Sequence, residues 1–518
     1  MKKIYLLAAT LVILLGAGGL LTACDDGSLS HKDVNIPDPV PESDDDDGIS
    51  QEPTTDAIIK VLPGEGHRHQ NIDGFGCSFG WMEAVYMNDK REQIMDDLYG
   101  DAGLRMNIYR GEVMGSYVDN QGKWDFQLDK NWLFAPGSSE VAKWKSDTYN
   151  SETGGLCKQM AQLWLIDYLT KKGLSDNIYY FFSVWSPPGI WKTGGDGLVG
   201  GEFNSQYGQT YARFLTDFVK SYKDKFGIHI YGISGWNEPD QAMGGWNGCQ
   251  WTYQQMADFV DNDLRPELNK EGLTDTKVVY GELPWWKNAL TWNQNSLQYK
   301  PQLKDDNIIA AGHSYSTVAA NILPDEVAEQ KGIPVWVTET CDDKTRNEDW
   351  ADAMKWAQIY QDYMTKARVN AIVWWAGARY ATTTGENLLQ TNSWDHSTTY
   401  YRVDRYYSIG QFSRYIPRNA TRVDVSGISG STVKLPKDLT LSAYVTDDTY
   451  TIVLVNNSTT KSVDAQVEID GKTFGSMVAY TSSANVKWQR KKLNPSMSGK
   501  RTVTIPKYSV VTLTGKWQ

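Results

Sequence analysis

The chain has 518 residues, of which 41% are hydrophobic and 22% are charged, so it can bury a large core and is too long for one ordinary domain. Its formal net charge of −12 argues against nucleic acid or an anionic membrane surface as a partner, because either would favour a basic patch. We therefore expect two folded domains and no nucleic-acid partner.

The first residues are typical of an export signal. Lys2 and Lys3 precede an apolar run over residues 4–21, and small residues then lead to Cys24. This pattern predicts a signal peptide over residues 1–23 and a lipid on Cys24. The alternative is an uncleaved anchor, because the run approaches the length that spans a membrane.

The segment after Cys24, residues 24–55, is polar and acidic and is expected to form a tether. The acidic residues that follow the cysteine resemble those of surface-exported bacterial lipoproteins. We therefore expect an exported lipoprotein held at the outer membrane by its lipid anchor, at the cell surface or on the periplasmic face. An exported chain permits disulfides, and three pairings remain open among Cys77, Cys157, Cys249 and Cys341.

Beyond residue 55 the chain alternates strand-like and helix-like segments, which predicts an α/β fold. After a first strand at residues 56–62, one strand ends near Phe75, and further strands are predicted at residues 104–109, 179–184, 228–234, 278–281, 308–311, 333–339 and 371–375. Large apolar side chains recur at helical spacing over residues 211–222, and Gly227 follows as a C-cap. We expect that helix to pack on the sheet.

Two acidic residues close two of these strands. Glu238 follows residues 228–234, where Pro239 stops the strand, and Glu339 ends residues 333–339. They lie 101 residues apart, which fits about three βα units of a TIM barrel at about 31 residues each. Strand ends of such a barrel open on one face, so both carboxyl groups can converge on one substrate. Paired carboxyl groups are what glycosidic bond cleavage requires, and beside Glu238 we expect Asn237 to read a hydroxyl group and Trp236 to form an apolar wall.

The motifs around these acids carry a family resemblance. Trp236-Asn237-Glu238-Pro239 and Thr338-Glu339-Thr340 resemble the clan of retaining (β/α)8 glycoside hydrolases with paired glutamates. Residues 72–76, 185–188 and 406–415 narrow the resemblance to glycoside hydrolase family 30, over residues 56–518. The resemblance implies a (β/α)8 TIM barrel with a C-terminal β-sandwich, Glu238 as acid/base, Glu339 as nucleophile and no cofactor. It divides the chain into residues 56–65, a strand that joins the side domain, a barrel at residues 66–415 and a sandwich at residues 416–518.

Further residues are expected at the mouth of the barrel. In related enzymes an arginine of the second strand holds the nucleophile, and of Arg105 and Arg110 we favour Arg110, which lies nearer the C-terminal edge. Tyr315 is expected to orient Glu339. Trp374 or Trp375 should floor the sugar subsite, and only one can face inward because strand neighbours alternate. The other expected site residues are Trp185, Glu282 and His313.

Two of these expectations leave alternatives open. Glu282 is expected to bind a sugar hydroxyl or a neighbouring side chain, and the six histidines lack the spacing typical of metal ligands, so we expect no metal. The long segment 111–155 either walls the substrate cleft or packs on the barrel flank.

The sequence thus predicts a retaining glycoside hydrolase that acts on a polysaccharide or oligosaccharide. Endo action on a β-linked polysaccharide, of the xylan, glucuronoxylan, β-1,6-glucan or β-1,6-galactan type, is the favoured hypothesis. The alternatives are an exo-acting β-glycosidase and a surface glycan-binding lipoprotein on an inactive barrel. The presence of both acids argues against the binding protein, and the glycan and its linkage stay open.

Overall fold

The computed structural model describes residues 55–79, 83–126, 128, 154–195, 197–241, 247–315, 318–380, 382–392, 398–426, 435–495 and 500–517. The predicted signal peptide, the tether and Cys24 lie outside these residues. Among the described helices, none combines the length and the apolar character needed to cross a membrane.

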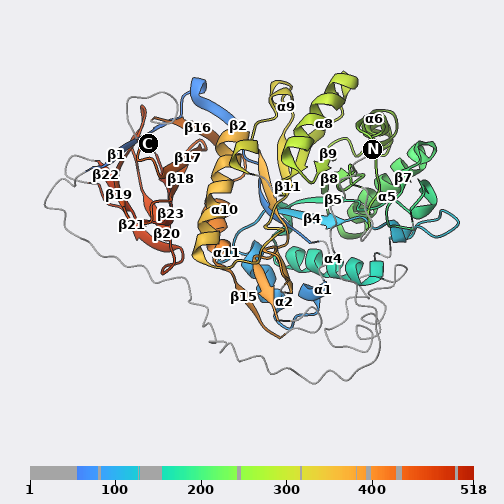
Figure 1. Cartoon of the computed structure of the whole chain (residues 1–518), viewed down its shortest axis with the longest axis horizontal. Helices are drawn as coiled ribbons and strands as arrows, with labels where there is room; N and C mark the ends of the chain where they lie inside the picture. The colour runs from blue at the N-terminus through green and yellow to red at the C-terminus, as the bar shows by residue number, and fades with distance from the viewer. Residues whose placement is uncertain are drawn as a thin grey trace, which may run out of the picture. The chain divides into compact units, whose positions relative to one another are not determined.

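Eight parallel strands close into a barrel, which confirms the predicted (β/α)8 fold (Figure 1). In chain order these strands are β3 (Gly74–Ser78), β4 (Ile108–Glu112), β5 (Tyr179–Ser183), β8 (Ile230–Ser234), β9 (Lys277–Leu283), β10 (Ile308–His313), β11 (Val335–Glu339) and β12 (Ala371–Trp374). The helices of this part of the chain are α1 (Glu83–Tyr86), α2 (Arg91–Tyr99), α4 (Gly154–Lys171), α5 (Gly208–Phe226), α6 (Tyr253–Phe259), α7 (Arg265–Lys270), α8 (Trp286–Tyr299), α9 (Glu326–Gln330), α10 (Trp350–Asp362) and α11 (Asp404–Ser413). Short strands in the connections are β6 (Lys192–Thr193), β7 (Glu202–Phe203), β13 (Ala378–Tyr380), β14 (Leu389–Thr391) and β15 (Tyr400–Arg402).

The barrel is filled by a small core of its own, to which alternate residues of the strands contribute. Trp336 is its largest member, and its ring lies 5.7 Å from the ring of Phe181. Residues of opposite parity, such as Val335 and Val337, belong instead to the large core between strands and helices. Helix α5 shows the predicted apolar stripe, and Gly227 ends it at φ 68°, in the left-handed conformation that glycine adopts without strain.

The predicted second strand was wrong in its position. Strand β4 begins at Ile108 rather than at residue 104, and Arg105 precedes it with a φ of 52° and an exposed side chain. Gly76 of β3 allows a close approach to the neighbouring strand β4, because a Cβ there would lie 2.2 Å from the carbonyl oxygen of Ile108.

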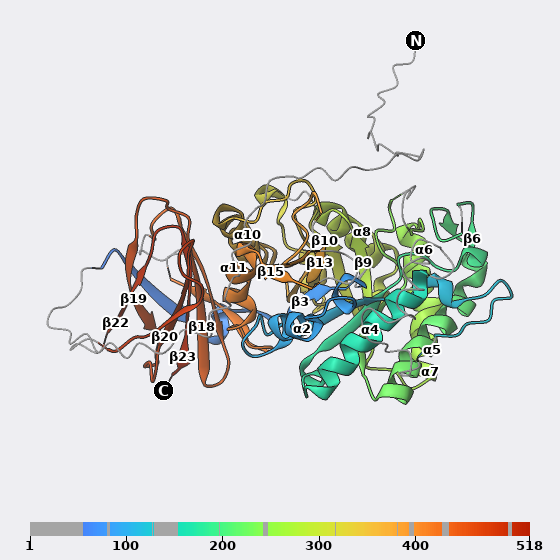
Figure 2. The same ribbon diagram turned by 90° about the horizontal axis from the view of Figure 1, so that it is seen from below.

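The C-terminal strands form a second core. Their sheet contains β1 (Ala57–Leu62), β2 (Arg68–Asn71), β16 (Thr421–Val425), β17 (Leu439–Val445), β18 (Thr449–Asn456), β19 (Val463–Ile469), β20 (Val478–Ser482), β21 (Gln489–Lys492), β22 (Arg501–Ile505) and β23 (Ser509–Lys516). Strands from both ends of this ten-stranded sheet contribute side chains to one hydrophobic core. The sheet therefore folds over on itself and encloses that core. Strand β1 pairs parallel to β19 and antiparallel to β16, so the start of the chain lies within the C-terminal sheet. Helices α10 and α11 contact this sheet from the barrel (Figure 2).

Candidate active site

Glu238 and Glu339 lie at the carboxyl ends of β8 and β11. Three atoms lie within 4.8 Å of one another: one carboxylate oxygen of each glutamate and one ring nitrogen of His313. Glu238 has a φ of 50°, which is uncommon for a residue with a side chain, and its N–H donates to the carbonyl oxygen of Glu282 over 2.9 Å. The strand therefore ends in a sharply turned backbone that a neighbouring strand holds in place.

Irregular strand pairing occurs next to the acids. The register of β10 with β11 shifts so that Gly312 pairs with Val337 and His313 pairs with Glu339. A second shift separates Ala311 from Gly312 in the pairing of β10 with β9, opposite Glu282. An extra residue in one strand reverses the faces of those that follow, so these bulges decide which side chains face the mouth.

Arg110 holds three of the site's polar groups. Its guanidinium donates to Glu339 through Nη1, to Asn237 Oδ1 over 2.7 Å through Nη2, and to Glu282 Oε1 over 3.0 Å through the same nitrogen. It is fully buried on β4 and lies 4.7 Å from the centre of the Trp185 ring. Ser78, for which no sequence motif predicted a role, pairs with Arg110 in the register of β3 and β4 and accepts a longer hydrogen bond from it.

Tyr315 and the tryptophans occupy the mouth. The hydroxyl group of Tyr315 donates to Glu339, as the sequence led us to expect, so that each oxygen of Glu339 has a different donor. Trp375 lies beside Trp185, with ring centres 6.0 Å apart. Trp374 instead faces the helices: its ring lies 4.6 Å from that of Trp356 in α10. Trp375 is therefore the residue of this pair on the side of the site.

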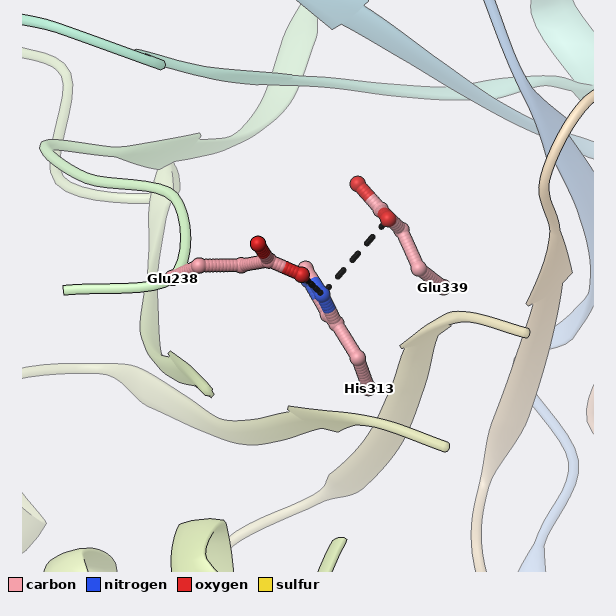
Figure 3. Close-up of side chains that lie close together, drawn as sticks. All are labelled: Glu238, His313 and Glu339. Carbon is pink, nitrogen blue, oxygen red and sulfur yellow. Dashed lines mark hydrogen bonds and ion pairs between the residues drawn. The ribbon is translucent and has the colours of Figure 1, made fainter. Parts of the chain in front are cut away.

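His313 lies between the two acids (Figure 3). Its Nδ1 is 3.1 Å from Glu238 Oε1 and 3.5 Å from Glu339 Oε2. Burial alone would lower the pKa of this imidazole, but the negative charge of Glu339 and the hydrogen bonds with the other glutamates raise it to about 9. The ring is thus protonated at neutral pH and donates to Glu238.

The surroundings of Glu238 and Glu282 shift the pKa values of these two acids in opposite directions. Burial raises the pKa of Glu238, the negative charge of Glu339 adds to that rise, and His313 acts against it. Burial would also raise the pKa of Glu282, but the charge of Arg110 and the interaction with His313 hold it at about 2. Glu238 is therefore the acid best placed to carry a proton, while Glu282 stays ionised.

Glu238, His313 and Glu339 are also the one set of described side chains whose donor atoms lie close enough to hold a metal ion. A cation there would have to displace the proton of His313, whose pKa is about 9, and overcome its positive charge. The donor set fits proton transfer better than metal binding.

Several expected sugar-binding residues lie elsewhere or are covered. Trp236 does not form a wall of the site, because its ring packs edge-on against Trp251 and Tyr280 in the outer core. Glu282 is fully buried and pairs with Arg110, so of its two predicted roles the structure shows the contact with a side chain. Arg110 and His313 are fully buried too; Arg110 contacts Glu339, and His313 contacts Glu238.

The structure bears in part on two further expectations, the path of segment 111–155 and the state of the cysteines. Trp124 packs on the flank of the barrel, where its Nε1 donates to Asp217 of α5, so this part of segment 111–155 is peripheral. Most of the segment lies outside the described residues, and for that part both alternatives stay open. Cys77, Cys249 and Cys341 are buried free thiols, and burial raises the pKa of Cys249 to about 12. The side chain of Cys157 lies outside the described residues.

Comparisons with known proteins agree with this arrangement. A family model described as the glycosyl hydrolase family 30 TIM-barrel domain matches residues 140–416. A Caenorhabditis elegans protein that bears the provisional name glucosylceramidase 1 is 23% identical over 449 residues, which cover 80% of this chain and 77% of that protein. The structure of a family 30 subfamily 8 xylanase from Clostridium acetobutylicum is similar, with a TM-score of 0.66, 22% identity and coverage of 89% of this chain and 99% of that one. That of an endo-β-1,6-glucanase gives a TM-score of 0.63 at 18% identity, with coverage of 89% and 94%.

Proposed function

The chain belongs to glycosyl hydrolase family 30 and is a glycoside hydrolase, and from this premise we propose that it cleaves internal linkages of a β-linked polysaccharide with retention of configuration. The observation that carries the proposal is the spacing and the unlike surroundings of Glu238 and Glu339. One carboxylate oxygen of each lies within 4.8 Å of the other, so the two groups are close enough to act on one anomeric carbon, as in retaining enzymes, whose carboxyl groups are about 5–5.5 Å apart.

In the first step Glu339 attacks the anomeric carbon while Glu238 protonates the leaving oxygen. Glu339 is positioned by Arg110 and Tyr315, which engage one carboxylate oxygen each. The raised pKa of Glu238 keeps its proton available until bond cleavage. The products are a covalent glycosyl-enzyme and an ionised Glu238.

In the second step Glu238 takes a proton from water, which attacks the anomeric carbon and releases Glu339. Formation of the ester removes the charge of Glu339, which had helped to raise the pKa of Glu238, so Glu238 can then remain ionised long enough to act as base. One residue therefore serves as acid and then as base.

The substrate proposal rests on the similar proteins. One is named as a xylanase and another as an endo-β-1,6-glucanase, which supports a xylan or a β-1,6-glucan as the polymer. The second candidate is an exo-acting β-glycosidase, which the relative named as a glucosylceramidase favours. Digestion of a panel of these polymers and of small β-glycosides, with sizing of the products, separates the two: endo action gives a ladder of oligosaccharides, and exo action gives monosaccharide from the start.

The division of roles is tested with two alanine variants and an aryl β-glycoside whose leaving group needs no proton. Glu238→Ala should form the glycosyl-enzyme and then stall, and azide should release a glycosyl azide of retained configuration. Glu339→Ala should lose turnover, with azide giving at best an inverted product. The opposite pattern would exchange the two roles, and normal activity of both variants would place the site elsewhere.

We also propose that the protein is exported and anchored through a lipid on Cys24, for which residues 1–24 provide the support. Cys24→Ala should shift the protein from the detergent phase to the aqueous phase. Ser28→Ala, four residues later, should leave the partition unchanged. A Cys24→Ala protein that stays in the membrane would favour the uncleaved anchor.

A further inference from the structure

Arg422 is a buried cation with an incomplete set of partners. Its side chain belongs to β16 and the residue is 7% exposed. Its Nε donates to Gln70 Oε1 over 2.9 Å, and no described residue accepts a hydrogen bond from Nη1 or Nη2. A guanidinium has five N–H donors, so four of them lack an acceptor within the described part of the protein. By contrast, buried Arg110 and Arg405 each contact a carboxylate.

The open side of Arg422 faces a pocket of about 170 Å³. The pocket lies where β2, β16 and β17 meet η10 (Tyr363–Ala367), the turn that continues α10. Its polar lining consists of His69, Thr365, Arg368, Arg422, Asp424 and Ser442. At about 30 Å³ per water, the space holds about five waters or one small polyatomic ion.

The other charged groups of the pocket already have partners. Arg368 donates from Nε to Glu329 Oε1 over 2.8 Å. Asp424 contacts His67 Nδ1 at 3.1 Å and His69 Nε2 at 2.7 Å. Burial acts to raise the pKa of Asp424, but its hydrogen bonds with these two histidines lower it, and the charge of Arg422 adds to the lowering. The charge of Asp424 thus reaches Arg422, but no carboxylate among the described residues forms a hydrogen bond or an ion pair with the guanidinium.

Hydrogen bonds from both the barrel and the C-terminal sheet fix the position of Arg422. Gln70, which accepts from Arg422, donates from its own amide to the carbonyl oxygen of Met364 in η10 over 2.7 Å. Ser442 of β17 donates to Gln361 Oε1 of α10 over 3.0 Å. The guanidinium is therefore held rigid at a point where barrel and C-terminal sheet meet, and rigid donors lose little freedom on binding.

We propose that this pocket binds a small oxyanion, a carboxylate or a phosphate, through the paired Nη1 and Nη2 donors of Arg422. The planar fork of a guanidinium matches two oxygens of either group, and both contacts are charge-assisted. Because Arg422 is 7% exposed, water screens its charge less than that of a surface arginine, which strengthens the interaction. Because the walls come from both the barrel and the C-terminal sheet, occupancy stabilises their junction, as any ligand of the native state does.

The test is calorimetric titration of the purified wild-type chain with inorganic phosphate and with glucuronate, each against a chloride buffer of equal ionic strength. Saturable binding of either ion at one site is expected, with a rise in melting temperature. Tighter binding of glucuronate identifies a carboxylate ligand, and tighter binding of phosphate identifies a phosphate. Binding of neither ion would overturn the proposal.

Variants locate the site. Arg422→Gln should weaken binding at least tenfold, and Arg346→Gln, a more exposed arginine that contacts Glu348, should leave it unchanged. Thr365→Glu keeps Arg422 and adds a carboxylate at the half-buried edge of the pocket, so it should abolish binding of added anion without unfolding the protein. If Arg422→Gln or Thr365→Glu bound the anion as tightly as the wild type, the site would be elsewhere.

Discussion

At the scale of single residues, Arg110 and His313 control the two glutamates. Arg110 is a fixed charge that joins Glu282, Asn237 and Glu339, whereas His313 carries a charge that depends on pH. Burial and the nearby Glu339 raise the pKa of Glu238, whereas His313 and Arg110 lower it. The net rise gives a physical reason why a proton is retained on Glu238.

The pH profile should report this coupling. His313 lowers the pKa of Glu238 by its hydrogen bond and its charge, so His313→Gln should raise that pKa further. Activity needs protonated Glu238 and falls as pH rises through its pKa, so the alkaline limb of kcat/KM should move to higher pH, while kcat falls. His229→Gln, at an exposed histidine near Asp275, should leave the limb in place. A limb that moves to lower pH would contradict the assignment of Glu238 as the acid.

Arg110→Lys should show that position, rather than charge alone, is required. A lysine is a point donor that cannot reach Glu282, Asn237 and Glu339 together, and a misplaced carboxylate costs about 10²-fold in rate. The matched control is Arg405→Lys, in a buried pair with Asp352 away from the site. It should lower the melting temperature while kcat per folded molecule stays near that of the wild type. Equal losses of kcat in both variants would indicate a general loss of folding.

At the scale of elements, the strand ends decide which residues the sequence could place. Regular alternation explains why Trp375 faces the site while Trp374 packs on Trp356. The same rule fails at Trp236, because the chain turns after Ser234 and its indole enters the outer core.

The register shifts beside Glu282 and Glu339 have no signature in the local sequence, since they arise from pairing between strands. The eight strands and both acids could thus be predicted from hydrophobic pattern and motif. The partners of Glu282 and the position of β4 could not, because they depend on tertiary pairing.

The connection from β9 to α8 predicts a further contact with the polymer. Trp285 is 43% exposed, and backbone hydrogen bonds from Glu238 to Glu282 and from Tyr315 to Pro284 hold this connection beside the site. An exposed indole on this connection can stack on a sugar ring of the polymer. Trp285→Ala should lower kcat/KM on polymer about tenfold, at about 1.4 kcal/mol, and leave small aryl glycosides unaffected.

Tyr299 offers the matched control, because it is an equally exposed aromatic at 49% and lies at the opposite end of the same helix. Tyr299→Ala should leave both activities unchanged. If Trp285→Ala reduced both activities alike, the indole would support the fold of the connection instead.

At the scale of the whole molecule, the two cores share one sheet. Neighbouring residues of β18 point to opposite sides: Ile452 belongs to the core of the C-terminal sheet, and Val453 belongs to the large core between the barrel strands and their helices. Strand β1 completes the C-terminal sheet from the other end of the chain by pairing with β19 and β16. The barrel and the C-terminal sheet are thus tied by packing on one face and by chain connectivity at both ends.

This arrangement predicts a single cooperative unfolding transition. Ile452→Asp and Val453→Asp each place a charge in a different core, which costs about 3–5 kcal/mol when no partner compensates it. If the cores unfold together, both variants should lower one common melting temperature by similar amounts, seen alike by calorimetry and by tryptophan fluorescence. Trp336 and Trp374 lie within the barrel, so part of that fluorescence reports the barrel even when the substitution is in the other core. If Ile452→Asp instead split the calorimetric trace and left a late transition at the wild-type temperature, the barrel would fold independently of the C-terminal sheet.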